Sequence, residues 1–144
     1  APKDFLLKII GTGPIINSLK EQGNANVEFL GSISNQEVLN QISNAKGVVT
    51  ATKLLEGQPT LLCEASSLGV PSIFPRTGGL REFFPEDYKF SFKQFDYSDL
   101  DEKLKLLISS DNTDTFGAES KLFIDKLLDE TSLITNFEDI LNEL

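Results

Sequence analysis

The chain has 144 residues, 40% of them hydrophobic, and a formal net charge of −9. This length fits one compact domain, and the acidic balance argues against a nucleic-acid or anionic-membrane surface, because both need a basic field. Histidine is absent and Cys63 is the single cysteine, which excludes imidazole catalysis, His-ligated zinc and an internal disulfide. The cysteine usage fits a reducing cytoplasm. Because the sequence starts at Ala1 and contains no methionine, we expect it to be a piece of a longer protein.

Apolar residues switch repeatedly between strand-like and helix-like periodicity along the chain. We expect strands at residues 5–11, 27–31, 47–52, 71–75 and 88–92. We expect helices at residues 15–23, 35–45, 59–69, 78–84 and 97–110, the last with Ser98 as its cap, and one or two helices over 116–144 with a break near Thr131 and Ser132. The alternation predicts a Rossmann-like α/β domain over residues 1–144, with a parallel sheet flanked by helices on both faces.

Ligands of such sheets bind outside the carboxyl ends of the strands. The first strand ends at Gly11-Thr12-Gly13-Pro14, where glycines and a following helix N-terminus would favour a phosphate. A tight turn needs glycine as well, so this loop is a weak signal. It is not a dinucleotide fingerprint, because the third glycine is missing and Pro14 removes one N–H donor.

The most informative segment runs from Glu56 to Glu64. Glu56 ends the loop after the third strand, and Glu64 is the only charged residue between Gly57 and Pro75. A carboxylate on so apolar a helix must reach solvent or find donors. A solvent-facing Glu64 is the simpler interpretation, whereas two carboxylates converging on the ligand crevice indicate a site for hydroxyl-bearing ligands.

The segment EGQPTLLCEASSLGVPSIFPRTGGLRE resembles the E-x7-E region of GT-B retaining glycosyltransferases of family 4. The positions in register include Glu56, Gly57, Glu64, Gly78 and Gly79, and the wider resemblance spans residues 5–108. It implies the C-terminal half of a GT-B fold, which binds a nucleotide-diphosphate sugar for retaining transfer of a hexose to a glycan or lipid acceptor. It implies no cofactor and no metal ion.

The resemblance also implies roles for individual residues. Glu56 would lie near the donor sugar as the catalytic carboxylate, and Glu64 would hold the ribose hydroxyls. The remaining donor-binding positions are Gly11, Gly13, Ser32, Ile33, Gly57, Gln58, Pro59 and Thr60. Asp99-Leu100-Asp101 fits a metal-binding string, but it lies at a helix start, where acidic residues stabilise the helix dipole.

Two features of the sequence limit this expectation. Members of the family carry an Arg and a Lys that neutralise the diphosphate on a loop that would precede Ala1, and the acceptor site lies on an N-terminal domain. We therefore expect weak nucleotide binding and no transfer by this chain alone. The expected partner is that N-terminal domain, through which any contact with the inner face of the membrane would be made.

Three other classes of α/β domain are alternatives. A receiver domain requires an acidic pocket at the strand ends, which here are Gly, Thr and Pro. A dinucleotide or methyl-donor enzyme requires an acidic residue after the second strand, where Gly31 stands. A non-catalytic or regulatory Rossmann-like nucleotide-binding domain stays open, because fold alone does not establish chemistry.

Overall fold

The computed structural model describes residues 5–22 and 25–142, so the expected helix ends at Gly23 and Leu144 lie outside the described residues. The chain divides into two compact units, residues 1–41 and 42–144. None of the described helices is long and apolar enough to cross a membrane.

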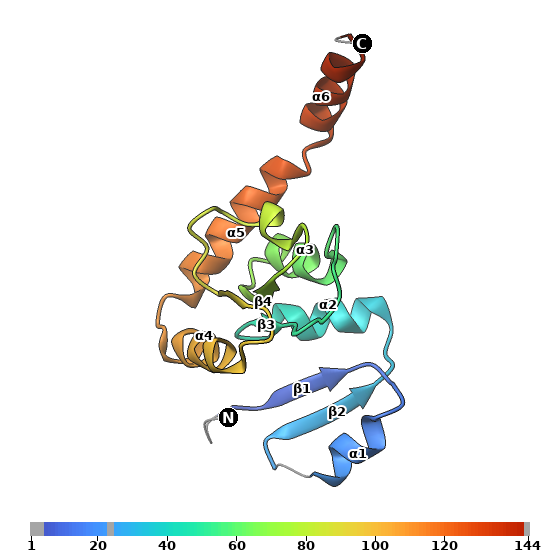
Figure 1. Cartoon of the computed structure of the whole chain (residues 1–144), viewed down its shortest axis with the longest axis vertical. Helices are drawn as coiled ribbons and strands as arrows, with labels where there is room; N and C mark the ends of the chain where they lie inside the picture. The colour runs from blue at the N-terminus through green and yellow to red at the C-terminus, as the bar shows by residue number, and fades with distance from the viewer. Residues whose placement is uncertain (1–4, 23–24, 143–144) are drawn as a thin grey trace. The chain divides into compact units, whose positions relative to one another are not determined.

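The first unit is built on two parallel strands, β1 (Leu7–Ile10) and β2 (Val27–Gly31), joined through helix α1 (Ile16–Glu21) (Figure 1). Leu7 lies opposite Val27, and Ile9 lies opposite Phe29. Helix α2 (Asn35–Ser43) follows β2. It begins with a capping box, in which the Ser34 N–H donates to the Glu37 carboxylate (2.8 Å) and the Glu37 N–H donates to Ser34 Oγ (3.3 Å).

The second unit contains three parallel strands in the order β3 (Val48–Val49), β4 (Ser72–Arg76) and β5 (Ser91–Lys93). The central strand β4 is buried from Ser72 to Pro75. Phe74 lies opposite Ser91, and Pro75 lies opposite Phe92. A strand with neighbours on both edges and helices on both faces is expected to be apolar, as Ile73, Phe74 and Pro75 of β4 are.

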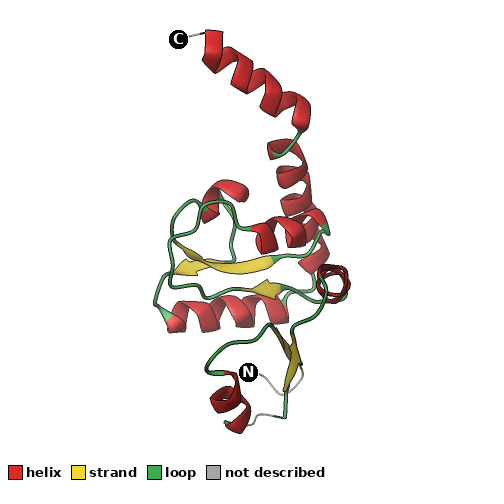
Figure 2. Ribbon diagram, turned by 90° about the vertical axis from the view of Figure 1, so that its right-hand side faces the viewer, coloured by secondary structure: helices red, strands yellow, loops and turns green. Residues whose placement is uncertain are grey.

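Five helical segments accompany these strands: α3 (Thr60–Ser67), the 3-10 helix η1 (Leu80–Phe83), α4 (Tyr97–Ser109), α5 (Thr113–Leu127) and α6 (Glu130–Asn142). Adjacent residues of β4 point to opposite faces. Phe74 packs with Leu62, Leu80 and Phe84 on the α3 side, whereas Ile73 packs with Phe90, Phe92 and Leu107 on the α4 side. Figure 2 shows the strands of this unit running between helices.

The fold class expected from the sequence is confirmed, since the chain is an α/β protein with parallel strands flanked by helices. Several local predictions were wrong. The third strand covers Val48–Val49, not 47–52. Asp96, not Ser98, caps α4, because its carboxylate accepts from the Asp99 N–H (3.1 Å). The last helical region breaks at residues 128–129, where Asp129 caps α6, so Thr131 and Ser132 lie inside that helix. The fifth strand covers Ser91–Lys93, not 88–92.

Candidate functional site

The loops that follow β3 and β4 are joined through their backbones. The Gly79 N–H donates to the Glu56 carbonyl oxygen at 2.9 Å. Gly78 adopts φ +52, and a Cβ placed there would contact the Glu56 carbonyl oxygen and lie 2.9 Å from the Glu56 nitrogen. Only glycine allows this backbone-to-backbone approach. The carboxyl ends of two neighbouring strands therefore hold Glu56 in a defined position.

Helix α3 starts directly after this junction. Pro59 is buried in an extended conformation (φ −88, ψ 90), and its carbonyl accepts from the N–H groups of Leu62 and Cys63, both at 3.0 Å. Helix geometry leaves the Thr60 and Leu61 N–H groups without an intrahelical acceptor. These N–H groups and the positive end of the helix dipole favour an anion here.

Glu56 and Glu64 are both half-buried. Glu64 lies in the second turn of α3, next to the buried residues Cys63 and Ala65. Burial raises the pKa of the Cys63 thiol, and the Glu64 charge raises it further. Glu64 is thus partly withdrawn from solvent. Gly57, Gln58 and Thr60 are exposed beside it.

The remaining expected donor-binding residues lie in the first unit. The Gly11 N–H donates to the Gly31 carbonyl oxygen at 2.7 Å, so the loops after β1 and β2 start side by side. Both glycines have positive φ, +119 and +68. Ser32 and Gly13 are exposed and Ile33 is half-buried. The structure brings Gly11 to the end of β2 and Glu56 to the loop after β4, each within its own unit.

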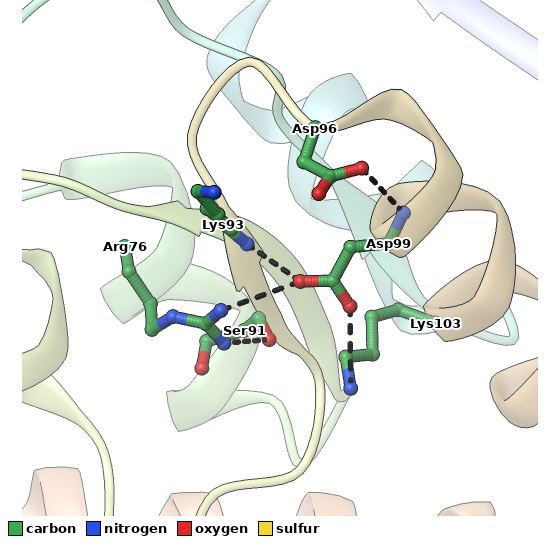
Figure 3. A network of polar contacts seen from close by, with 6 residues as sticks. All are labelled: Arg76, Ser91, Lys93, Asp96, Asp99 and Lys103. Carbon is green, nitrogen blue, oxygen red and sulfur yellow. Dashed lines mark hydrogen bonds and ion pairs between the residues drawn. The ribbon is translucent and has the colours of Figure 1, made fainter.

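Asp99, the first residue of the metal-like string, is part of a polar network between β4, β5 and α4 (Figure 3). Its carboxylate accepts from the Lys93 N–H (2.7 Å) and lies 3.3 Å from Arg76 and 3.5 Å from Lys103. The Lys93 N–H and the two cations hold the pKa of Asp99 below its usual range. Asp101 pairs instead with Lys105. Asp99 therefore fastens a helix to the sheet, in agreement with the expected stabilisation of the helix start.

Sequence reasoning left Gly78, Gly79 and Thr77 outside the site. Gly78 and Gly79 are in register with the resemblance to the E-x7-E region, but only the structure shows their contact with Glu56. Thr77 is buried, and its hydroxyl has no hydrogen-bond partner among the described residues. The glycine pair at the start of a helix was the available signal, because glycines there often mark a close backbone approach.

This fold corresponds to that of a known class of enzyme. Residues 2–120 match the family described as glycosyl transferases group 1, and the chain belongs to that family. The solved structures of similar fold are GT-B glycosyltransferases. No curated protein sequence is significantly similar to the chain.

Three solved structures illustrate the likeness. HepE from Anabaena, solved with UDP, is 15% identical with a TM-score of 0.78, and the similarity covers all of this chain and 42% of HepE. Sucrose-phosphate synthase from Thermosynechococcus elongatus is 17% identical with a TM-score of 0.78, covering 95% of this chain and 38% of that one. The catalytic domain of cholesterol-alpha-glucosyltransferase from Helicobacter pylori is 21% identical with a TM-score of 0.70, covering 87% and 79%. The chain thus spans about two fifths of the length of HepE.

Proposed function

We propose that this chain is the donor-binding domain of a retaining, hexose-transferring glycosyltransferase of family 4. The observation that carries the proposal is the junction between the Glu56-Gly57 loop and Gly78-Gly79, which holds the Glu56 backbone a few residues before the N-terminus of α3. The family assignment supports it. HepE structures with UDP and with UDP-glucose make a uridine nucleotide the first donor to test.

In this proposal the expected site residues bind the donor or stabilise charge on it. The backbone N–H groups of Gly57, Gln58 and Thr60, at and just before the start of α3, donate hydrogen bonds to the diphosphate. Glu64 accepts hydrogen bonds from the ribose hydroxyls, and Glu56 stabilises the positive charge that develops on the sugar as the bond to the diphosphate breaks. Gly11, Gly13, Ser32 and Ile33 complete the donor site. We propose that no metal ion or other cofactor takes part.

The test is an NMR titration of the ¹⁵N-labelled chain with UDP, GDP and ADP. We expect one base to shift the amides of Gly57 and Thr60 most strongly, and Glu64→Ala to weaken that response at least about tenfold, as expected for the loss of a hydrogen bond to a charged group. Glu119→Ala, an exposed glutamate on α5, is the matched control and should bind like the unaltered chain. An equal response in both variants would contradict the role of Glu64.

The alternative is a non-catalytic nucleotide-binding domain. The two functions can be distinguished by an assay on the longer protein that includes the N-terminal acceptor domain. We propose that this protein works in the cytoplasm and meets any membrane through that domain. In a sugar-transfer assay with UDP-glucose and related donors, Glu56→Gln should lower kcat at least about a hundredfold, the size typical of a lost electrostatic contact, and leave UDP binding unchanged. Nucleotide binding without any sugar transfer would favour the regulatory alternative.

A further inference from the structure

The second unit carries a groove that the proposed donor site does not use. It has a volume of about 560 Å³ and lies between the segment from η1 to β5 and helix α4. Four of the chain's 13 Lys and Arg residues line it, together with two acidic residues: Arg76, Arg81, Lys89, Lys103, Glu86 and Asp87. This concentration of cations stands out in a chain of net charge −9.

The positive charges of the groove are only partly compensated from inside the protein. The single carboxylate of Asp99 compensates two of these positive charges, because both Arg76 and Lys103 pair with it. Arg81 donates to the Glu86 carbonyl oxygen at 2.7 Å, and the Lys89 ammonium lies 5.5 Å from the centre of the Phe116 ring. A carbonyl and an aromatic ring orient a cation without neutralising it, so Arg81 and Lys89 keep their charge for a ligand.

The lining of the groove restricts what it can hold. The groove is open to solvent, and its charged lining disfavours an apolar ligand. Clustered Arg and Lys side chains bind phosphate well, whereas Glu86 and Asp87 would repel a bare anion. Carboxylates accept hydrogen bonds from hydroxyl groups, so this mixture suits a molecule that carries both a phosphate and hydroxyls.

We propose that this groove binds a small hydroxyl-bearing phosphate ester, such as a sugar phosphate. Arg81 and Lys89 hold the phosphate, with Lys103 adding charge, and the Glu86 and Asp87 carboxylates accept from the hydroxyls. The site is separate from the Glu56 loop and does not rest on the function proposed above.

Binding is tested on the ¹⁵N-labelled chain with three probes, namely glucose 6-phosphate, inorganic phosphate and glucose. We expect saturable shifts at Tyr88, Ser91 and Lys103 with glucose 6-phosphate below about 10 mM, the weak end of specific binding. Inorganic phosphate should bind more weakly, and glucose should not bind. Absence of a saturable response to glucose 6-phosphate would overturn the proposal, as would equal affinity for inorganic phosphate.

Substitutions of the cations in the groove test which side chains contact the phosphate of glucose 6-phosphate. Lys89→Gln and Arg81→Gln should each weaken glucose 6-phosphate binding at least about tenfold, since each removes a charge-assisted bond to phosphate. Lys105→Gln, which removes a cation from the same helix as Lys103 but outside the groove, is the matched control. Arg81 also makes a structural hydrogen bond. If Arg81→Gln does not fold, Lys89→Gln alone tests the contact with the phosphate. Equal binding by Lys89→Gln and Lys105→Gln would place the ligand elsewhere.

One further variant tests the hydroxyl contact. Glu86→Gln should weaken glucose 6-phosphate binding but leave inorganic phosphate binding equal or tighter, because it replaces a charged acceptor by a weaker neutral one and removes a repulsive charge. The same loss for both probes would contradict this arrangement. Saturating UDP should not displace glucose 6-phosphate. The donor-site proposal and the groove proposal can therefore fail independently of each other.

Discussion

At the scale of single residues, Gly78 fixes the position of Glu56. Gly78→Ala would force a side chain into the left-handed region (φ +52), 2.9 Å from the Glu56 nitrogen. We expect the free energy of unfolding to fall by about 2 kcal/mol and the UDP response of Gly57 to disappear, because the loop must move. Urea denaturation and the NMR titration measure the two effects.

The control for this change is Gly57→Ala. A Cβ at Gly57 meets no heavy atom within 4 Å, so its effect on stability should stay within about 0.5 kcal/mol. If Gly78→Ala were as stable as Gly57→Ala, the two loops would not be in contact in solution.

The residues of the proposed site could be named from the sequence, but their contacts could not. Glu56 and Glu64 stand out because each is a charge in an apolar or glycine-rich segment. The partner of Glu56, Gly79, lies 23 positions further along the chain, and no local pattern links them. The cap of α4 shows the same limit. Ser98 and Asp96 are both good caps, and the turn at Phe95 (φ 67), where the Asp96 N–H donates to Lys93, selects Asp96.

At the scale of elements, Asp99 ties α4 to β4 and β5. Its side chain is 20% exposed and accepts from Lys93, Arg76 and Lys103. Asp99→Asn should lower the free energy of unfolding at pH 7 by about 1.5 kcal/mol, the value of a hydrogen bond to a charged group. Asp101→Asn, which breaks only the exposed pair with Lys105 in the same helix, should cost less than about 0.5 kcal/mol.

This contribution of Asp99 depends on pH with a defined sign. Its pKa is lower in the folded chain than in the unfolded one, so the stabilisation is present above the unfolded pKa of about 4 and is lost as the pH falls through the folded pKa. The gap in stability between the unaltered chain and Asp99→Asn should therefore narrow below about pH 4. A gap that stays constant from pH 7 to pH 3 would mean that packing, not charge, accounts for it.

Elements were easier to predict than their ends. The alternation of strand-like and helix-like periods located each of the five strands of the described residues, because short apolar strands alternate with amphipathic helices along the chain. The boundaries depend on hydrogen bonds that the pattern does not contain. Tyr88 was expected in the fifth strand, yet its hydroxyl donates to the Ser72 carbonyl oxygen and accepts from the Ser72 N–H, and pairing with β4 begins only at Ser91. Asp129 likewise accepts from the Ser132 N–H and starts α6 earlier than expected.

At the scale of the whole molecule, the sequence was sufficient for the fold class and the family. The arrangement of the parts was not predictable in the same way. Hydrogen bonds join β1 to β2 and β3 through β5 as two sets of strands, and the expected donor-binding residues divide between the two units. One domain over residues 1–144, and one donor site shared by Gly11 and Glu56, stay predictions, because they depend on long-range packing between segments that no sequence period describes.

The last helix offers a test of what stabilises the whole chain. Five apolar side chains of α6 are 48–62% exposed, namely Leu133, Ile134, Phe137, Ile140 and Leu141, and none of its described residues is buried. A chain ending at Asp129 should therefore keep its urea midpoint, with a change in the free energy of unfolding below about 0.5 kcal/mol. It should also stay soluble at higher concentration, because an exposed apolar stripe promotes association.

Helix α5 supplies the control for this truncation. Ile124 on α5 is 1% exposed and α5 packs against α3, so Ile124→Ala should cost about 3 kcal/mol, as expected for a large-to-small change in a core. A loss of similar size on removing residues 130–144 would show that α6 buries its apolar face against this chain in solution. A preserved midpoint would show that the core ends with α5, and that the apolar face of α6 contributes nothing to the folding of residues 1–129.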